Sequence, residues 1–238
     1  MPNVTPELLA LCVIWYIVFL LSTTCHEAAH AWAAKLGGDL TAYHGGQVSL
    51  NPLPHIQRAP IGMVLAPLVS FFWQGGRWMI GWASAPYDIR WAERYPRRAA
   101  WMALAGPAAN FTLMLLAAAG VRIGMALGYL NAPDRIRFPM VTEATNPDAG
   151  FAATFLSVMF VLNLVLGTFN LLPVPPLDGH AGITLLFPER TAVRFLEATG
   201  QGAFQLAGLL LAWYGYGYLF QRIFVVALNL LYPGLNYG

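Results

Sequence analysis

This sequence contains little charge. Lysine and arginine contribute 13 of its 238 residues and aspartate and glutamate 11, so charged residues make up 10% of the chain, against about 25% in soluble domains. Hydrophobic residues reach 58%, and the mean hydropathy is +0.55. These values indicate a polytopic membrane protein. The net charge of +2 is small and no basic run stands out, so nucleic acid is not an expected partner.

Cysteine is scarce, and the start of the sequence lacks a signal-peptide pattern. Cys12 and Cys25 lie on one expected helix about 20 Å apart, which is too far for them to bridge each other. Residues 1–7 have no basic region of the kind with which a signal peptide begins. The apolar run that follows has the length of a bilayer span, so we expect it to be retained as the first helix.

The long apolar runs predict an all-α polytopic membrane protein in which residues 1–238 form a single domain. About four full transmembrane helices are expected, at residues 6–36, 99–127, 151–172 and 206–231. Segment 60–83 is apolar but is interrupted by Pro67 and by Gln74-Gly75-Gly76-Arg77. A re-entrant or broken helical segment therefore competes with one kinked helix.

Two short segments after the first helix follow other patterns. Residues 39–50 read as two short strands around Gly45-Gly46, which predicts a small membrane-associated β-hairpin. Residues 51–56 carry two prolines and are expected to be irregular. The hairpin is either a plain connector or a template whose open edge pairs with an extended substrate segment.

The charges between the spans predict the orientation of the chain. Residues 84–98 carry four arginines against two acids, which marks the cytoplasmic side by the positive-inside rule. Acids outnumber bases in residues 128–150, which fits the opposite side. The helices at 6–36 and 151–172 should therefore both end on the cytoplasmic side, where residues 185–205 predict a short surface helix.

The first span ends in a His-Glu-x-x-His motif, formed by His26, Glu27 and His30. Between residues 8 and 34 these are the only ionisable groups apart from the two cysteines and Tyr16, and ionisable groups inside an apolar span are functional candidates because they are costly there. Histidines four apart share one helix face and can reach one metal ion, while the neighbouring glutamate can reach a water at the metal. The alternative is a helix with two histidines facing a lumen or solvent.

A catalytic zinc requires a third protein ligand. His44 and His55 lie in loops and are either ligands or, as loop histidines commonly are, solvated or hydrogen-bonded. Asp178 follows prolines at 173, 175 and 176, which forbid helix, and precedes Gly179, which permits a tight turn. Non-helical backbone at membrane depth must be buried or line a wet cavity. The expected topology brings this aspartate to the depth of the two imidazoles.

Three motifs follow one another along the chain. His-Glu-Ala-Ala-His at 26–30 closes one helix, Ala-Gly-Pro-Ala-Ala-Asn at 105–110 opens another, and Asn-x-x-Pro-x-Pro-Pro-x-Asp-Gly at 170–179 closes a third. This set resembles the site-2 proteases, the intramembrane zinc metalloproteases. Residues 45–55 resemble a compact prokaryotic branch of that family, and the PDZ domain of several bacterial members has no counterpart in the printed sequence. Asn110, in the second motif, is expected to make an interhelical hydrogen bond.

The resemblance implies roles for single residues. Zinc would be bound by His26, His30 and Asp178. Glu27 would be the general base, and Asn170 matches the motif asparagine that would bind substrate or assist at the oxyanion. His180, directly after the Asp-Gly pair, is a candidate for a group that supports the ligands.

The predicted function is that of a zinc-dependent endopeptidase that cleaves transmembrane segments of membrane proteins within the bilayer, with water activated by zinc and Glu27. The substrate must unwind locally, and pairing with the 40–50 hairpin would hold it open. The expected setting is a bacterial or archaeal cell membrane, with the site toward the cytoplasm. Two alternatives are a zinc-binding membrane carrier or sensor without proteolytic activity, which has no need of Glu27, and a catalytically silent scaffold.

Overall fold

A computed structural model describes residues 4–237. Four helices are long and apolar enough to cross a membrane, which confirms the predicted fold class. They are α1 (Pro6–Gly37), α6 (Pro96–Ala126), α7 (Gly150–Asn170) and α10 (Gly202–Leu231). Their bounds lie within a few residues of those expected from the apolar runs.

The ends of α1 follow from its sequence. The Thr5 hydroxyl accepts a hydrogen bond from the Leu8 amide at 3.3 Å, and Pro6 occupies the first turn, where a missing amide does no harm. Gly38 follows the helix at φ +97°, a left-handed conformation that favours glycine and ends the helix. The His-Glu-x-x-His motif therefore lies in the last third of a continuous helix.

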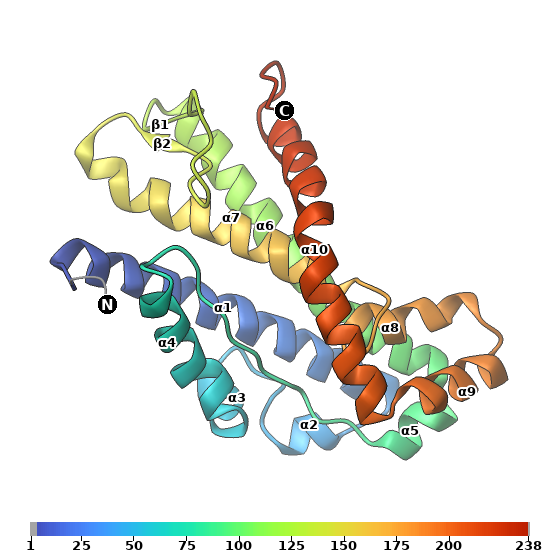
Figure 1. Cartoon of the computed structure of the whole chain (residues 1–238). Helices are drawn as coiled ribbons and strands as arrows, with labels where there is room; N and C mark the ends of the chain where they lie inside the picture. The colour runs from blue at the N-terminus through green and yellow to red at the C-terminus, as the bar shows by residue number, and fades with distance from the viewer. Residues whose placement is uncertain (1–3, 238) are drawn as a thin grey trace.

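Three helices form the core and lie side by side in Figure 1. α6 packs along both α1 and α7. Trp15, Val18 and Phe19 of α1 and residues 158–162 of α7 are buried in one apolar cluster. α10 crosses this group steeply in Figure 1, and most of its apolar surface stays exposed, as suits a helix in contact with lipid.

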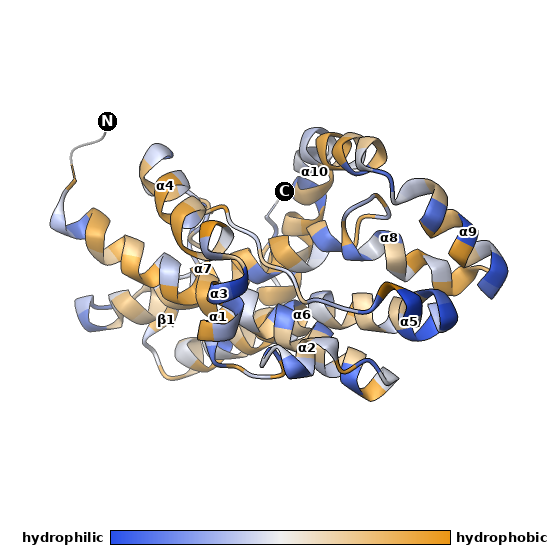
Figure 2. Ribbon diagram, turned by 90° about the horizontal axis from the view of Figure 1, so that it is seen from below, coloured by the Kyte–Doolittle hydropathy of each residue, from blue (hydrophilic) through white to orange (hydrophobic). Residues whose placement is uncertain are grey.

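α1 and α7 end at the same end of the molecule, as the loop charges predicted (Figure 1). The more hydrophilic helices gather there, in blue on Figure 2. The short elements at this end are α5 (Ile89–Arg94), α8 (Asp178–Gly182), η3 (Ile183–Leu186) and α9 (Glu189–Thr199). The surface helix expected within 185–205 is thus present as α9.

The predicted hairpin at 39–50 is wrong. Residues Thr41–His44 form a short helix, α2, because the Asp39 carboxylate accepts hydrogen bonds from both the amide (2.9 Å) and the hydroxyl (2.6 Å) of Thr41. Gly46 has φ +72° but Gly45 has φ −76°, whereas both favoured two-residue hairpin turns need a positive φ at the first of the two residues. The antiparallel strand pair of the described residues lies elsewhere: it joins β1 (Leu130–Asn131) to β2 (Glu143–Ala144), ahead of η2 (Pro147–Ala149).

The proline-rich stretch after it is helical rather than irregular. α3 (Pro52–Arg58) begins at Asn51, whose side chain accepts a hydrogen bond from the Leu53 amide at 3.0 Å. Both prolines fall in the first turn, where the amides they lack have no helical partner. Local capping therefore overrides the general rule that proline breaks helices.

Segment 60–83 is broken, and one kinked helix does not form. η1 (Ile61–Leu65) and α4 (Ala66–Trp73) follow α3 after a bend of 113°. The chain then turns at Gly75 and Gly76, both at positive φ, and residues 77–88 return without helix or strand, as a drawn-out chain in Figure 1. This extended segment connects α4 to α5 in Figure 1.

Candidate metal centre

The structure brings His26, His30 and Asp178 together. Their ligand atoms all lie within 4.8 Å of one another, and this is the one such group of three or more His, Cys, Asp or Glu side chains in residues 4–237. Nε2 of His26 is 3.1 Å from Oδ2 of Asp178, and Nε2 of His30 is 3.4 Å from Oδ1. The two Nε2 atoms are 2.9 Å apart. Residues far apart in sequence thus present three ligand atoms to one point.

The hydrogen bonds of the two rings leave Nε2 free to act as a ligand. Nδ1–H of His26 donates to Oδ1 of Asn110 at 2.6 Å, and Nδ1–H of His30 donates to the carbonyl of Met102 at 2.8 Å. Since both Nδ1 atoms carry the proton, both Nε2 atoms carry a lone pair. Oδ2 of Asp178 is buried with no hydrogen-bond partner. Three electron-pair donors that converge without a proton between them fit a metal cation, and imidazole and carboxylate are ligands that zinc accepts.

Gly106 of α6 is a residue of the site that the sequence reasoning missed. A Cβ atom at this position would lie 2.3 Å from Nε2 of His30 and 2.5 Å from Nε2 of His26. The backbone of α6 therefore approaches the ligand atoms to a distance that only glycine allows. The glycine of the Ala-Gly-Pro-Ala-Ala-Asn motif at 105–110 carried this signal.

Gly179 has a related role at the third ligand. A Cβ there would lie 2.1 Å from the carbonyl oxygen of Leu171, so the chain folds back onto the end of α7 just after Asp178. This agrees with the expectation that glycine lets the chain turn tightly past the aspartate.

Glu27 is buried beside the ligands, with 5% of its surface exposed. On α1 its side chain is rotated by roughly 60° from His30. No hydrogen bond occupies its carboxylate in the described part of the chain. It is thus free to take a proton from a water molecule near the ligand atoms.

The other sequence candidates lie apart from this group. His44 is exposed, and Nε2–H of His55 donates to the carbonyl of Ser49 at 3.1 Å. Nε2 of His180 pairs with the Thr199 hydroxyl at 2.7 Å and so links α8 to α9 rather than contacting a ligand. Asn170 is the last residue of α7 and is half-buried.

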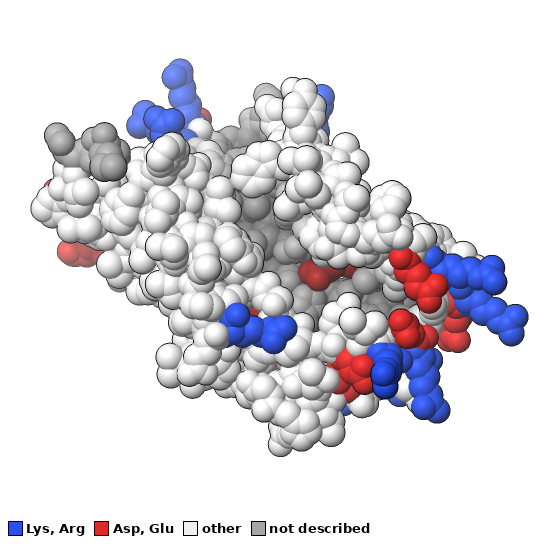
Figure 3. Space-filling view, turned by 60° about the horizontal axis from the view of Figure 1, so that its bottom comes forward, with Lys and Arg blue, Asp and Glu red and all other residues white. Residues whose placement is uncertain are grey.

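The site can be reached from outside the bundle. Figure 3 shows a hollow near the centre of one face, with acidic atoms inside it and mainly uncharged surface around it. The Asp178 side chain keeps 21% of its surface exposed. The third residue of the cluster is therefore partly accessible from outside the bundle.

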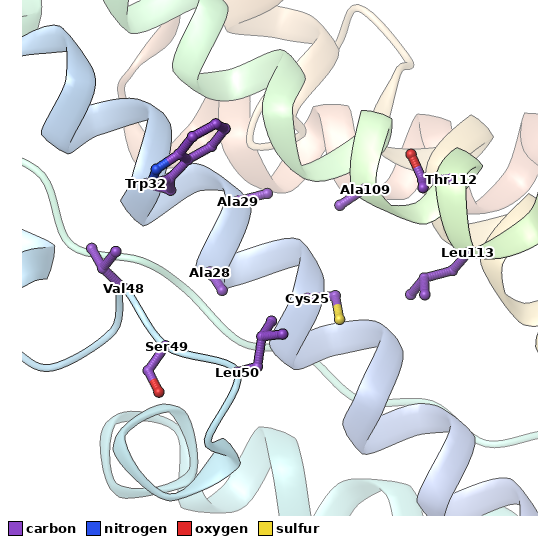
Figure 4. A pocket seen from close by; sticks show the side chains of 10 residues that line it. All are labelled: Cys25, Ala28, Ala29, Trp32, Val48, Ser49, Leu50, Ala109, Thr112 and Leu113. Carbon is purple, nitrogen blue, oxygen red and sulfur yellow. The ribbon is translucent and has the colours of Figure 1, made fainter. Parts of the chain in front are cut away.

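A groove of about 540 Å³ lies on another face of α1 (Figure 4). It is lined by Cys25, Ala28 and Trp32 of α1, by residues 48–50 and by Ala109 of α6. This face of α1 points roughly 150° away from Glu27 around the helix axis. The groove is therefore not the path by which a substrate would reach the glutamate.

Helices that span a membrane, with two histidines, an aspartate and a glutamate buried between them, are features of membrane-embedded metallopeptidases. The profile of peptidase family M50 matches residues 14–215, and the chain belongs to this family, the site-2 protease family that its motifs resemble.

Two relatives carry provisional names as zinc metalloproteases. The chain is 30% identical over 234 residues to YwhC of Bacillus subtilis (strain 168). This match covers 93% of this chain and 85% of YwhC. It is 28% identical over 165 residues to Rip2 of Mycolicibacterium smegmatis (strain ATCC 700084 / mc(2)155). That match covers 69% of this chain and 54% of Rip2. No solved structure matches the chain.

Proposed function

We propose that this protein is a zinc-dependent endopeptidase that cleaves transmembrane segments of other membrane proteins within the bilayer. The observation that carries the proposal is the convergence of His26, His30 and Asp178 beside Glu27, inside a bundle of membrane-length helices. The relatives named as zinc metalloproteases support zinc as the metal. In this proposal the whole chain is one protease domain.

Glu27 carries the proton in the proposed reaction. His26, His30 and Asp178 would hold a zinc ion, which would supply a Lewis acid for the attacking water and the scissile carbonyl. Glu27 takes a proton from the attacking water as its oxygen bonds to the carbonyl carbon, and passes that proton to the nitrogen that leaves when the C–N bond breaks. Asn170, near the third ligand in sequence, is proposed to bind the substrate.

We infer that the substrate pairs with the extended segment at 77–88 instead of the 39–50 region. Main-chain groups of residues 80, 82 and 84 are hydrogen-bonded to other parts of the protein. The Ile80 amide donates to Ser70 Oγ, which in turn donates to the Ile80 carbonyl. The Trp82 amide donates to the Gly62 carbonyl, and the Gln47 side chain donates to the Ser84 carbonyl. Alternate residues of an extended chain point to opposite edges. Accordingly Gly81, Ala83 and Ala85 have no main-chain hydrogen-bond partner within residues 4–237, which leaves one edge open for strand addition.

The contacts of this segment with α1 support a position of the open edge at the level of Glu27. A Cβ at Gly76 would lie 2.6 Å from Leu8, one at Gly81 would lie 2.4 Å from Phe19, and the Asp88 amide donates to Asp39 at 2.9 Å. The segment therefore follows α1 from its first turns to its end. Since Glu27 is about 12 Å along the helix from Phe19, and a strand rises about 3.4 Å per residue, the residues level with Glu27 are 84 and 85.

We further propose that the site lies nearer the cytoplasmic face of a bacterial or archaeal cell membrane. The arginines of 84–98 and the polar helices α5 and α9 lie at the end of the molecule where α1 ends (Figure 2). Positive charge beside a membrane span favours the cytoplasmic side.

The test is cleavage of a single-span substrate by purified protein, with and without a zinc chelator. Glu27→Gln should abolish cleavage and leave zinc bound, because the amide cannot accept the proton while the ligands are unchanged. Glu93→Gln, at an exposed position of α5, is the matched control and should cleave normally. Cleavage at the wild-type rate by Glu27→Gln, or cleavage that the chelator does not affect, would contradict the proposal.

A further inference from the structure

A chain of buried polar side chains connects α7 to the metal site through α6. Ser22 of α1, Asn110 of α6 and Asn163 of α7 are all fully buried. Nδ2–H of Asn110 donates to Oδ1 of Asn163 at 2.9 Å and to the Ser22 carbonyl at 3.4 Å. Nδ2–H of Asn163 donates to the Ser22 hydroxyl at 2.8 Å and to the Met159 carbonyl at 2.9 Å.

The hydrogen bonds of these side chains fix the orientation of each amide, from Asn163 through Asn110 to His26. Asn163 uses its amide hydrogens on Ser22 and Met159, so its oxygen faces Asn110. Asn110 then turns its own amide hydrogens toward Asn163 and its oxygen toward His26, 2.6 Å from Nδ1. An oxygen in that position requires the proton of His26 to reside on Nδ1. The lone pair of Nε2 consequently faces Asp178.

Burying side-chain amides at membrane depth costs free energy, so they occur there where all of their polar groups are hydrogen-bonded. Simple adhesion between helices would need only some pairing of the two amides, in either orientation. The observed orientation instead delivers an acceptor to the non-ligating nitrogen of a histidine in the metal site, which is how outer groups fix the ring and raise its basicity.

We propose that Asn110 and Asn163 are positioning residues for the metal, with Asn163 acting through Asn110 to fix the proton on Nδ1 of His26 and the orientation of its ring. This inference rests on the proposed function, because it takes His26 to be a metal ligand. It adds α7, which contributes no ligand, to the parts of the molecule that set metal affinity.

The test is binding of cobalt(II) to the purified full-length apoprotein, followed by its visible absorption and by competition with a chelator. Asn110→Leu removes the acceptor, and we expect a loss of 10- to 100-fold in affinity. Asn110→Asp keeps an acceptor at the same place but loses both amide donors, and we expect affinity within a few-fold of wild type. Asn163→Leu leaves the Asn110 amide free to flip, which exchanges the positions of its oxygen and nitrogen. We expect a lower cobalt affinity and a changed cobalt spectrum.

The comparison of Asp with Leu at position 110 separates positioning from helix adhesion. Both variants lose the donation to Asn163 and to Ser22, so a purely adhesive role would weaken both equally in thermal stability and in cobalt binding. Asn229→Leu, an amide of α10 that bonds to Tyr237 far from the ligands in sequence, is the control and should bind cobalt as wild type does.

Two results would overturn the inference: wild-type affinity and spectrum in Asn110→Leu, or an equal loss in Asn110→Asp and Asn110→Leu. If the wild-type protein itself binds no cobalt, the proposed function fails and this inference fails with it. Normal cobalt binding by wild type together with either of the first two results rejects the positioning role alone.

Discussion

Substitution of Gly106 by alanine is a small change that should disable the metal site while the helical bundle remains. The new methyl carbon would lie 2.3 Å from Nε2 of His30 and 2.5 Å from Nε2 of His26. To reach even 3.0 Å, the ring of His30 must retreat by at least 0.7 Å. Ligand distances in metal sites hold within about 0.2 Å, so this displacement exceeds the tolerance about threefold.

The rings have little freedom to retreat. Their Nδ1 atoms are bonded to Asn110 and to the Met102 carbonyl, and those acceptors belong to the same helix as the new methyl group. Either these bonds break or α6 moves away from α1. Overpacking of this kind costs about 1–3 kcal/mol of stability, which a bundle of long helices can tolerate. A misplacement of about 1 Å at a reacting centre can reduce the rate about 100-fold.

The assay measures zinc content after chelator challenge and cleavage of a single-span substrate, with circular dichroism as the test of folding. We expect Gly106→Ala to retain helical content, to lose zinc at chelator concentrations that wild type withstands, and to cleave about 100-fold more slowly. Gly120→Ala is the matched control on the same helix, because its methyl group would meet the flexible end of Leu156 at 2.8 Å. Normal zinc retention and cleavage by Gly106→Ala would refute the reasoning.

Two further predictions concern the segments beside the site. Ala83→Pro removes an amide from the open edge, while the hydrogen bonds of Trp82 to Gly62 and of Ser84 to Gln47 remain. We expect a rise in KM of up to about tenfold with zinc content unchanged. Equal KM values for Ala83→Pro and the control Ala83→Ser would contradict strand pairing. Burial raises the pKa of Asp39, but hydrogen bonds from the Thr41 side chain and amide and from the Asp88 amide outweigh this effect and hold the pKa below its ordinary value. The stability that Asp39 contributes is therefore present above about pH 4 and is lost as the pH falls through the lowered pKa; Asp39→Asn should lower the apparent Tm at pH 7 and flatten its acid dependence, and an unchanged acid dependence would contradict this.

Several features of the molecule could be predicted from the sequence because they depend on local composition. The four spans follow from apolar runs of bilayer length, and the ends of α1 follow from Thr5, Pro6 and Gly38. That Asp178 lies at the depth of the histidines followed from topology, since the helix that carries the histidines and the helix that precedes Asp178 end on the same side. The family followed from three motifs in order, and the matched profile agrees with it.

The predictions were wrong where a hydrogen bond from a side chain to the backbone determines the local structure more strongly than the residue pattern does. The glycine pair at 45–46 indicated a hairpin, but Asp39 bonds to Thr41 and starts a helical turn. The prolines after Asn51 indicated irregular chain, but they fit the first turn of α3. In each case one side chain that caps a backbone amide decided the local structure.

By itself the sequence determined which residue types are available to the site and where along the helices they lie, because hydropathy and helix periodicity act over short stretches of chain. The tertiary structure alone decided the close approach of Gly106 to the imidazoles, the direction of the Asn163 to His26 hydrogen-bond chain and the open edge at 81–85. Each of these depends on distances between helices or segments far apart in sequence, and such distances are set by how the whole bundle packs.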